Sequence, residues 1–279
     1  MERQFIHNLV TSFTLWFDHT LLSKGKAFSN TSGRLYSMKD DEFAGYNVFG
    51  SPFKQWVYDS SISGANIPSG LYVNGNFKSR GTTGLALDFQ NGRGIFDGGN
   101  SSWNVSGNFS VKDFNIYRTT RSDEELLFNN NYLLNPSFPQ VSTGIPGDKI
   151  IAPAIFIKLS KFTNDAFSIG GLDESTANMR VVVLSDSEYS LDAVGSIFSD
   201  TRYNNFGVFP KTPLNEFGDV KSGLYNYNNY LTEYSNPSNL AYIADVDYSK
   251  LLTIGDKKLD PNLDIGFLDF DIRFVRTTQ

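Results

Sequence analysis

The chain has 279 residues, of which 40% are hydrophobic and only 19% are charged, and its formal net charge is −6. It contains no cysteine, which excludes disulfide bonds, cysteine-ligated metals and a thiol nucleophile. An acidic chain without a block of Lys and Arg is poorly suited to gripping a phosphate backbone, so we expect no sequence-specific nucleic-acid binding, although such a chain could line a passive conduit for DNA.

Residues 1–25 are predicted to form one amphipathic helix, because apolar side chains recur at three- and four-residue spacing and Gly25 provides a stop. Phe13, Trp16 and Phe17 make the apolar face unusually aromatic. Two alternatives are open for this face. It packs against the protein's own sheet, or it docks onto a neighbouring subunit.

The two histidines of the chain, His7 and His19, both lie in this predicted helix. Twelve helical positions separate them by roughly 120° around the axis. They therefore cannot share a metal ion within one subunit, and each is expected to be a surface or packing residue.

Residues 26–135 are predicted to form a β-hairpin domain, with a loop and one or two short strands before residue 63. Asn74-Gly75 and Asn91-Gly92 are each flanked by β-forming residues, which is the strongest short-range signal for a two-residue hairpin turn. For the second hairpin the two-residue turn predicts that Phe89 faces Gly94 and that Leu87 faces Phe96.

The segment from Phe109 to Tyr117 is predicted to be a strand whose apolar residues change phase, which a β-bulge near Lys112 would explain. Ser122 and Glu125 then have the spacing of a capping box that opens a short helix.

The prolines at 136 and 139 mark the predicted domain boundary, and residues 140–279 are expected to form a second β-rich half. This half contains predicted strands at 150–162, 179–184, 240–246 and 265–275 and a helix within 187–200 that crosses one face of the sheet. The predicted fold class is therefore a β-rich α+β protein with antiparallel sheets, hairpins and few helices. The two halves are either separate domains or one composite domain.

Tyr225, Tyr227 and Tyr230 lie among asparagines in a segment that lacks regular periodicity. Such a Tyr- and Asn-rich loop is either an ordinary surface loop or a source of rigid contact area at an interface. Together with Phe13, Trp16 and Phe17, these tyrosines are the predicted subunit-contact residues.

Candidate chemistry is sparse. Asp245 with Asp247, and Asp269 with Asp271, each place two carboxylates on one strand face, as in some Ca²⁺ sites and glycosidases. Any sheet with one solvated face offers such pairs by chance, which is the favoured interpretation. The sequence has no phosphate loop, zinc motif or serine-nucleophile context. We therefore expect no enzyme, no metal and no cofactor.

The phrase Ile116-Tyr117, Arg121-Ser122 and Glu124-Glu125-Leu126 resembles the closing strand of laminin-G-like and concanavalin-like lectin jelly rolls. This resemblance implies a carbohydrate-binding module for attachment to a host surface. It is the alternative function.

The segments SGLYVNGNF, ALDFQNGRGIF and VKDFNIY, with the cysteine-free, Asn- and aromatic-rich composition, resemble virion structural proteins of tailed phages. The resemblance implies a non-enzymatic ring subunit of the neck, head–tail connector or tail. Its partners would be copies of itself and other virion proteins. No stretch is apolar enough to span a membrane and the N-terminus lacks a signal peptide, so assembly is expected in the host cytoplasm.

Overall fold

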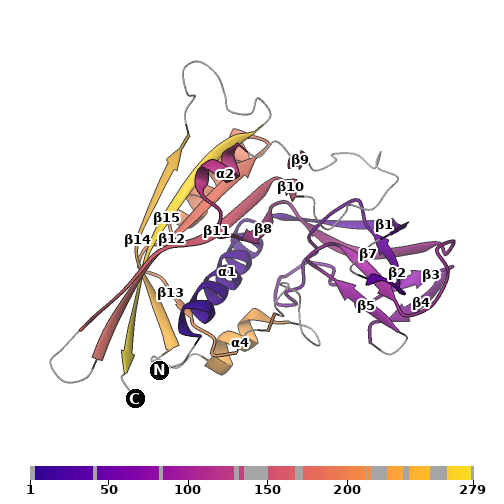
Figure 1. Cartoon of the computed structure of the whole chain (residues 1–279), viewed down its shortest axis with the longest axis horizontal. Helices are drawn as coiled ribbons and strands as arrows, with labels where there is room; N and C mark the ends of the chain where they lie inside the picture. Colours follow the sequence, from indigo (N-terminus) through magenta and orange to yellow (C-terminus); the bar gives the residue numbers. More distant parts are fainter. Residues whose placement is uncertain are drawn as a thin grey trace.

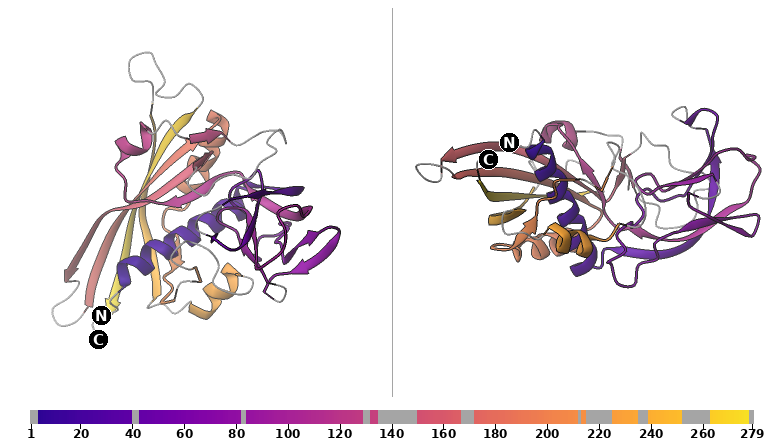
Figure 2. Two further views of the ribbon diagram at one scale, coloured as in Figure 1. Left: turned by 45° about the vertical axis from the view of Figure 1, so that its right-hand side comes forward. Right: turned by 90° about the horizontal axis from the view of Figure 1, so that it is seen from below.

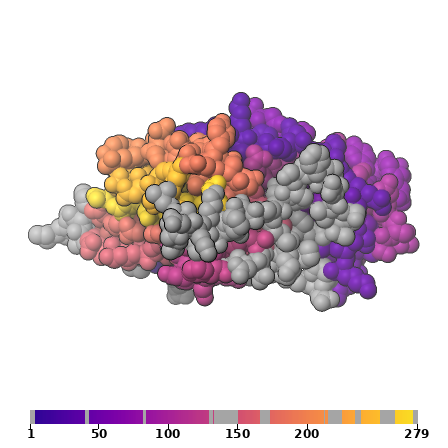
Figure 3. All heavy atoms as spheres, turned by 90° about the horizontal axis from the view of Figure 1, so that it is seen from above, coloured from indigo at the N-terminus to yellow at the C-terminus, as the bar shows by residue number. Residues whose placement is uncertain are grey.

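The computed structural model describes residues 4–39, 43–81, 84–128, 132–134, 150–166, 172–211, 213–214, 225–234, 239–251 and 263–277. Two antiparallel sheets dominate it, with an N-terminal helix and three further helices, so the predicted β-rich α+β class is confirmed. The two sheets occupy opposite ends of an elongated body (Figures 1 and 3).

The first sheet has seven strands in the order β4-β3-β7-β1-β2-β6-β5. Its strands are β1 (Phe28–Met38), β2 (Asn47–Gly50), β3 (Gly70–Val73), β4 (Asn76–Ser79), β5 (Leu85–Asp88), β6 (Arg93–Phe96) and β7 (Val105–Lys112). β1 pairs with β7 through residues 28–35 and with β2 through residues 36–38, so this one strand links the two halves of the sheet. The halves fold onto each other, since Leu71 of β3 lies against Gly94 of β6.

The second sheet has six strands in the order β13-β14-β15-β12-β11-β8. Its strands are β8 (Asn115–Arg118), β11 (Ala154–Ala166), β12 (Leu172–Ser185), β13 (Asn205–Gly207), β14 (Leu240–Lys250) and β15 (Asp264–Thr277). All neighbours are antiparallel except β8 and β11, which are parallel. A small parallel pair, β9 (Tyr132–Leu134) and β10 (Ile150–Ala152), lies apart from both sheets.

Helix α1 (Phe5–Lys24) crosses one face of the six-stranded sheet and reaches the seven-stranded sheet (Figures 1 and 2). Helix α3 (Glu188–Ser199) covers the same face as α1, and Phe17 stacks on Phe198 with ring centroids 3.8 Å apart. One hydrophobic cluster runs from Phe109 in the first sheet through α1 to Met179 in the second. The chain is thus held together by a helix buried between its two sheets.

The opposite face of the six-stranded sheet, which we call the outer face, is covered only in part. Helix α2 (Asp123–Leu127) buries Leu126 against Phe156 and Val182 near one end. Further along, the outer face carries polar and charged side chains from β11, β12, β14 and β15.

Both predicted hairpins form, but the register predicted for the second hairpin is wrong. Asn74 and Gly75 have φ of 50° and 83° between paired Val73 and Asn76, which is the expected two-residue turn. In the second hairpin Leu87 faces Gly94, a shift of two residues that leaves the same side chains on the buried face. The reason is a four-residue loop in which Asp88 accepts a hydrogen bond from the Asn91 backbone N–H at 2.8 Å.

The phase change near Lys112 is a change of sheet and not a bulge. β7 ends at Lys112 in the seven-stranded sheet, and β8 begins at Asn115 beside β11 in the six-stranded sheet. The lectin-like phrase therefore starts on β8, a strand of the six-stranded sheet. The capping box that follows is confirmed, with Ser122 accepting from Glu125 N and the Glu125 side chain accepting from Ser122 N.

Several predictions on the second half are confirmed, namely the long strands and the helix over one face of the sheet. The predicted loop at 225–230 is wrong, because α4 (Tyr227–Tyr234) is a helix. The short strands predicted before residue 63 include β1, which is eleven residues long. The proposed boundary at 135–140 lies outside the described residues.

Candidate functional site

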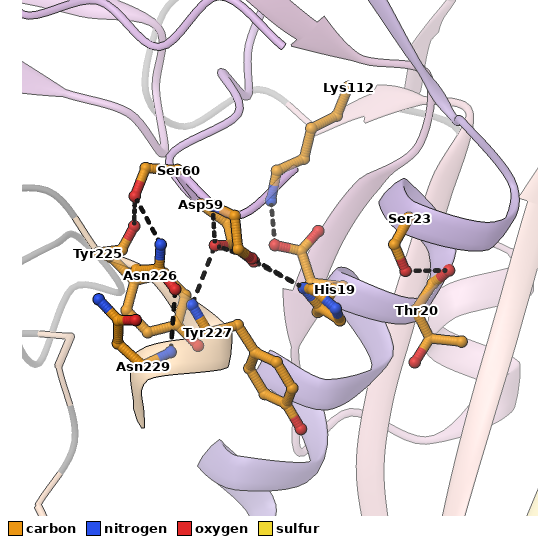
Figure 4. A network of polar contacts seen from close by, with 12 residues as sticks. His19, Thr20, Ser23, Asp59, Ser60, Lys112, Tyr225, Asn226, Tyr227 and Asn229 are labelled. Carbon is orange, nitrogen blue, oxygen red and sulfur yellow. Dashed lines mark hydrogen bonds and ion pairs between the residues drawn. The ribbon is translucent and has the colours of Figure 1, made fainter. Parts of the chain in front are cut away.

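The most elaborate polar cluster lies where α1, the segment 55–61 and α4 meet (Figure 4). α1 directs Phe13 and Phe17 toward the six-stranded sheet, and directs Asp18 and His19 toward the seven-stranded sheet. We call this cluster the helix junction. It consists of Asp18, His19, Tyr58, Asp59, Ser61, Lys112, Tyr225 and Tyr227.

An ion pair lies at the base of the helix junction. Lys112 Nζ donates to Asp18 Oδ2 at 2.8 Å, and the two side chains are 4% and 5% exposed. The ammonium also lies 4.6 Å from the centre of the Tyr58 ring. Burial and the neighbouring Asp18 carboxylate raise the pKa of the Tyr58 hydroxyl well above its usual value, so this phenol stays protonated.

Asp59 receives hydrogen bonds from α1, from α4 and from its own segment. Its carboxylate contacts His19 Nδ1 at 2.8 Å, Ser61 Oγ at 2.7 Å and the backbone N–H of Tyr227 at 3.0 Å. Burial would raise the pKa of Asp59, but the hydrogen bonds from His19, Tyr227 and Ser61 outweigh it and lower the pKa. A buried carboxylate thus joins α1 to the start of α4.

The grouping of Ser61, His19 and Asp59 has the composition of a catalytic triad but not its geometry. Asp59 and Ser61 both approach the same ring nitrogen, His19 Nδ1, at 2.8 and 3.4 Å. In a triad the serine contacts the other ring nitrogen, so that the histidine can carry its proton away. Here the Ser61 hydroxyl donates to Asp59, which makes it a local turn contact two residues along the chain.

The Tyr- and Asn-rich segment completes the helix junction. Asn226 accepts from the backbone N–H of Asn229 at 2.9 Å and so caps α4. The Tyr227 ring stacks on His19 with centroids 4.4 Å apart. Ser60 N and Oγ both donate to the Tyr225 carbonyl at 2.8 Å, which fixes the start of α4 against the segment 55–61.

A cavity of about 290 Å³ lies beside the helix junction. It is lined by Thr14, Asp18, Gln55, Tyr58, Gln90, Lys112, Ile116, Tyr117, Arg118 and Leu214. Some of its polar side chains bond within the chain, whereas Asp18 Oδ1 and the Tyr117 hydroxyl are buried without a hydrogen-bond partner. Gln55 forms two hydrogen bonds of 2.9 Å with the backbone of Ile116, and Arg118 donates to Thr11 at 2.8 Å. Gln55 and Arg118 are thus held in place on the wall of the cavity by bonds within the chain.

The predicted subunit-contact residues are mostly in the interior. Phe13 and Phe17 have no exposed surface and Trp16 is 7% exposed, because α1 is enclosed between the two sheets. The structure thus confirms that this face packs against the protein's own sheet. The prediction that these three residues dock onto a neighbour is wrong.

Tyr225 and Tyr227 are each 3% exposed, because their rings pack on Tyr58 and His19. The prediction that they form a subunit contact is therefore also wrong. Tyr230 is partly buried and contacts Phe209, and its role at an interface stays a prediction. His7 is exposed, as expected, whereas sequence reasoning missed the polar contacts of His19.

The two aspartate pairs come together on the outer face. Asp245 lies directly opposite Asp271, and Asp247 directly opposite Asp269, on the neighbouring strands β14 and β15. Burial raises the pKa of Asp269 despite the Arg180 guanidinium nearby. Among the described residues, no group of three or more His, Asp or Glu side chains has the arrangement of a metal site.

Comparison with known proteins gives no family. No protein-family model matches the chain, and no curated protein matches it. None of the described helices combines the length and apolarity needed to cross a membrane.

Proposed function

We propose that the protein is a non-enzymatic virion structural protein, a ring subunit in the neck, connector or tail of a tailed phage. The observation that carries the proposal is the placement of exposed aromatic pairs on both sheets. On the β3–β4 hairpin the ring centroids of Tyr72 and Phe77 lie 5.3 Å apart. Beside β13 the stacked rings of Tyr203 and Tyr242 have centroids 6.3 Å apart. All four are at least 38% exposed.

A ring subunit needs two different contact surfaces, because each copy touches one neighbour with one surface and the next neighbour with another. Exposed aromatic side chains are typical anchors of such contacts. The helix junction supports this role as well, since its charged groups bond to one another and stiffen the body that would transmit contacts between neighbours.

The outer face supports passage of DNA. Four aspartates lie together where β14 and β15 pair on this face, and carboxylates, unlike lysines and arginines, do not release counterions from a phosphate backbone. In a ring whose lumen is lined by these four aspartates, DNA would slide without being held.

The mass of the purified protein tests the proposal. We expect light scattering and negative-stain images of one sample to show closed rings. Replacing both Tyr72 and Phe77 by Ala should weaken assembly while leaving the unfolding midpoint almost unchanged, because both side chains are exposed. The matched control is Tyr189→Ala, which removes an 86% exposed ring on α3 that has no aromatic neighbour among the described residues. A protein that stays monomeric in every preparation would contradict the proposal.

One observation favours the carbohydrate-binding alternative. The solvent-facing side of β3, β7 and β1 presents Tyr72 next to Ser106 and Arg34, with a hydrogen bond between Ser32 and Asn108 of 2.8 Å in the following row. Aromatic rings beside hydroxyl and amide groups suit stacking and hydrogen bonding to neutral sugars. A strict monomer that binds glycans on an array, and loses binding with Tyr72→Ala, would favour this function.

A further inference from the structure

The cavity beside the helix junction has both buried and half-buried walls. Asp18, Tyr58 and Lys112 are buried, and we call the side that they line the floor. Thr14 and Arg118 are half-buried, and we call the side that they line the rim. The volume of about 290 Å³ lies at the lower end of small-molecule sites, which measure about 300–1,000 Å³. The cavity therefore has room for a ligand of about one sugar ring.

The floor holds a buried acceptor that has no donor. The Asp18 side chain is 5% exposed, and its Oδ2 accepts from Lys112 Nζ at 2.8 Å. Asp18 Oδ1 is buried and accepts no hydrogen bond from any residue that the structure describes. The Tyr58 hydroxyl lies near this carboxylate but not in hydrogen-bond geometry with Oδ1. A buried carboxylate oxygen is costly to leave unpaired, so a ligand that donates to Oδ1 is favoured.

A hydroxyl is the donor that suits the floor. It can donate to Asp18 Oδ1 and also accept from the Lys112 ammonium or from the protonated Tyr58 hydroxyl. An ammonium group only donates, and it would lie beside the positive charge of Lys112. The floor therefore selects hydroxy compounds over amines.

The rim carries a positive charge without a counter-charge. Three charged side chains line the cavity, and two of them, Asp18 and Lys112, neutralise each other. The third is Arg118, whose Nη1 donates to the neutral Thr11 hydroxyl at 2.8 Å and which pairs with no carboxylate of the described ranges. Burial lowers the pKa of Arg118, as expected for a cation that lacks a nearby anion. A guanidinium presents paired N–H groups to a carboxylate, so the rim suits a ligand with one carboxylate.

The positions of Arg118 and Asp18 set the length of the ligand. Arg118 is held at Thr11, and Thr11 and Asp18 lie two helical turns apart on one face of α1. Two turns of α-helix rise about 10 Å. The carboxylate of the ligand and the hydroxyl that reaches Asp18 Oδ1 thus belong to opposite ends of the molecule, as they do across the ring of a hexuronic acid. Acetate is too short to contact both.

We propose that this cavity binds a hydroxy acid of the size of a hexuronic acid, with its carboxylate on Arg118 and a distal hydroxyl on Asp18 Oδ1. The carboxylate neutralises the rim, and the hydroxyl supplies the donor that the floor lacks. The site does not rest on the proposed ring role, because every contact comes from one copy of the chain.

Calorimetric titration of the full chain provides the first test. The probes are D-glucuronate and D-galacturonate, and we expect at least one of them to bind. D-Glucose lacks the carboxylate and acetate lacks the distal hydroxyl. Each of these two controls should therefore bind at least about tenfold more weakly than the better uronate.

A variant that fills the cavity provides the second test. Thr14→Leu places a larger side chain at the rim and should abolish binding of the uronate. The matched control is Thr232→Leu on α4, since both threonine hydroxyls donate at 2.8 Å to the carbonyl four residues earlier and Thr232 is exposed. Thr232→Leu should bind as the original protein does. Urea unfolding is expected to show that both variants fold, because neither residue is fully buried.

Removal of the charge at the rim provides the third test. Arg118→Gln should weaken uronate binding about tenfold or more and leave D-glucose binding unchanged, since only the carboxylate contacts this residue. Arg118→Lys keeps the charge but not the paired N–H groups, so it should recover part of the loss. An equal loss for D-glucose would overturn the role of Arg118 as the carboxylate partner.

The same chemistry occurs in a free uronate and in the residue at the end of an acidic polysaccharide. The methyl glycoside of the bound uronate distinguishes the two sources, because its first carbon is blocked as it is in a polysaccharide. Equal binding of the glycoside assigns the end of a polysaccharide, and loss of binding assigns the free acid. Either result supports the site.

The outcomes separate this site from the ring role. Failure of both uronates to bind, or binding that Thr14→Leu leaves unchanged, would overturn the site. The ring role is unaffected by that result, because it is read from the mass and the images of the protein alone. Binding that Thr14→Leu removes and that Arg118→Gln weakens selectively supports the site.

Discussion

Asp18 of α1 and Lys112 of β7 lie 94 residues apart in the chain and meet at 2.8 Å with almost no exposed surface. This ion pair fastens the N-terminal helix to the end of the strand where the chain leaves the seven-stranded sheet. It lies on the wall of the cavity and beside Tyr58, and it adds a polar contact to the apolar packing that holds α1.

Removing one partner of this pair should be costly. Asp18→Leu or Lys112→Met alone leaves an uncompensated buried charge, and each should reduce the free energy of unfolding by about 3–5 kcal/mol. The double variant should lose much less than the sum, because neither charge remains. Urea unfolding measures all three. Arg202→Gln, which breaks an exposed pair with Asp245, should change stability by less than about 1 kcal/mol. Additive losses in the double variant would show that the two charges do not act on each other.

Asp59 should make stability depend on pH. Its pKa in the folded protein lies below the ordinary value of 3.8, so folding favours the ionised carboxylate. The resulting stability is present above the ordinary value and is lost as the pH falls through the lower folded value. Asp59→Asn should cost about 2–3 kcal/mol at neutral pH. The difference in unfolding midpoint between the original protein and the Asp59→Asn variant should become smaller toward acidic pH. A gap that does not vary with pH would contradict this role.

The aromatic face of α1 should contribute to folding and not to contacts between copies. Phe17→Ala removes a ring that is fully buried and stacked on Phe198, so it should cost about 3–5 kcal/mol in urea unfolding. Phe17→Leu should cost less because it leaves a smaller cavity. Association of the folded fraction, measured by sedimentation velocity, should match that of the original protein. A loss of association at unchanged stability would show that these residues form a subunit contact.

Leu71 packs directly against Gly94 on the facing half of the seven-stranded sheet, which leaves no room for a side chain at position 94. A Cβ at Gly94 would clash with Leu71 Cδ1, so Gly94→Ala should cost about 1–3 kcal/mol. Shortening the neighbour with Leu71→Val in the same protein should recover part of this loss. The matched control is Gly33→Ala on β1, where a Cβ meets nothing within 4 Å and where alanine should be neutral or slightly stabilising. Equal losses at Gly94 and Gly33 would contradict this packing.

Features that depend on near neighbours in the chain were predictable. The spacing of apolar residues predicts α1, and the Ser122–Glu125 spacing predicts the cap of α2. Asn74-Gly75 predicts its turn because both residues adopt the left-handed backbone that a two-residue hairpin requires. In each case the energy that selects the structure comes from contacts only a few residues apart.

Other features depend on contacts between distant segments, and these were missed. The Asn91-Gly92 turn has the same local signal, yet Trp56 N donates to the Phe89 carbonyl and Phe89 is buried, so a longer loop forms. The phase change after Lys112 looks like a bulge along the chain. Only the presence of β11 turns it into a passage from one sheet to the other.

The candidate site follows the same division. His19, Asp59 and Tyr227 can be read in the sequence, but His19 lies 40 residues from Asp59 and Tyr227 lies 168 residues from it, and no pattern links them. Likewise each aspartate pair was visible on its own strand, whereas the pairing of β14 with β15 placed the two pairs face to face. Local propensity therefore specified α1, the cap of α2 and the Asn74-Gly75 turn. Burial of apolar surface between sheets, together with the need to pair every buried charge, decided which distant residues meet.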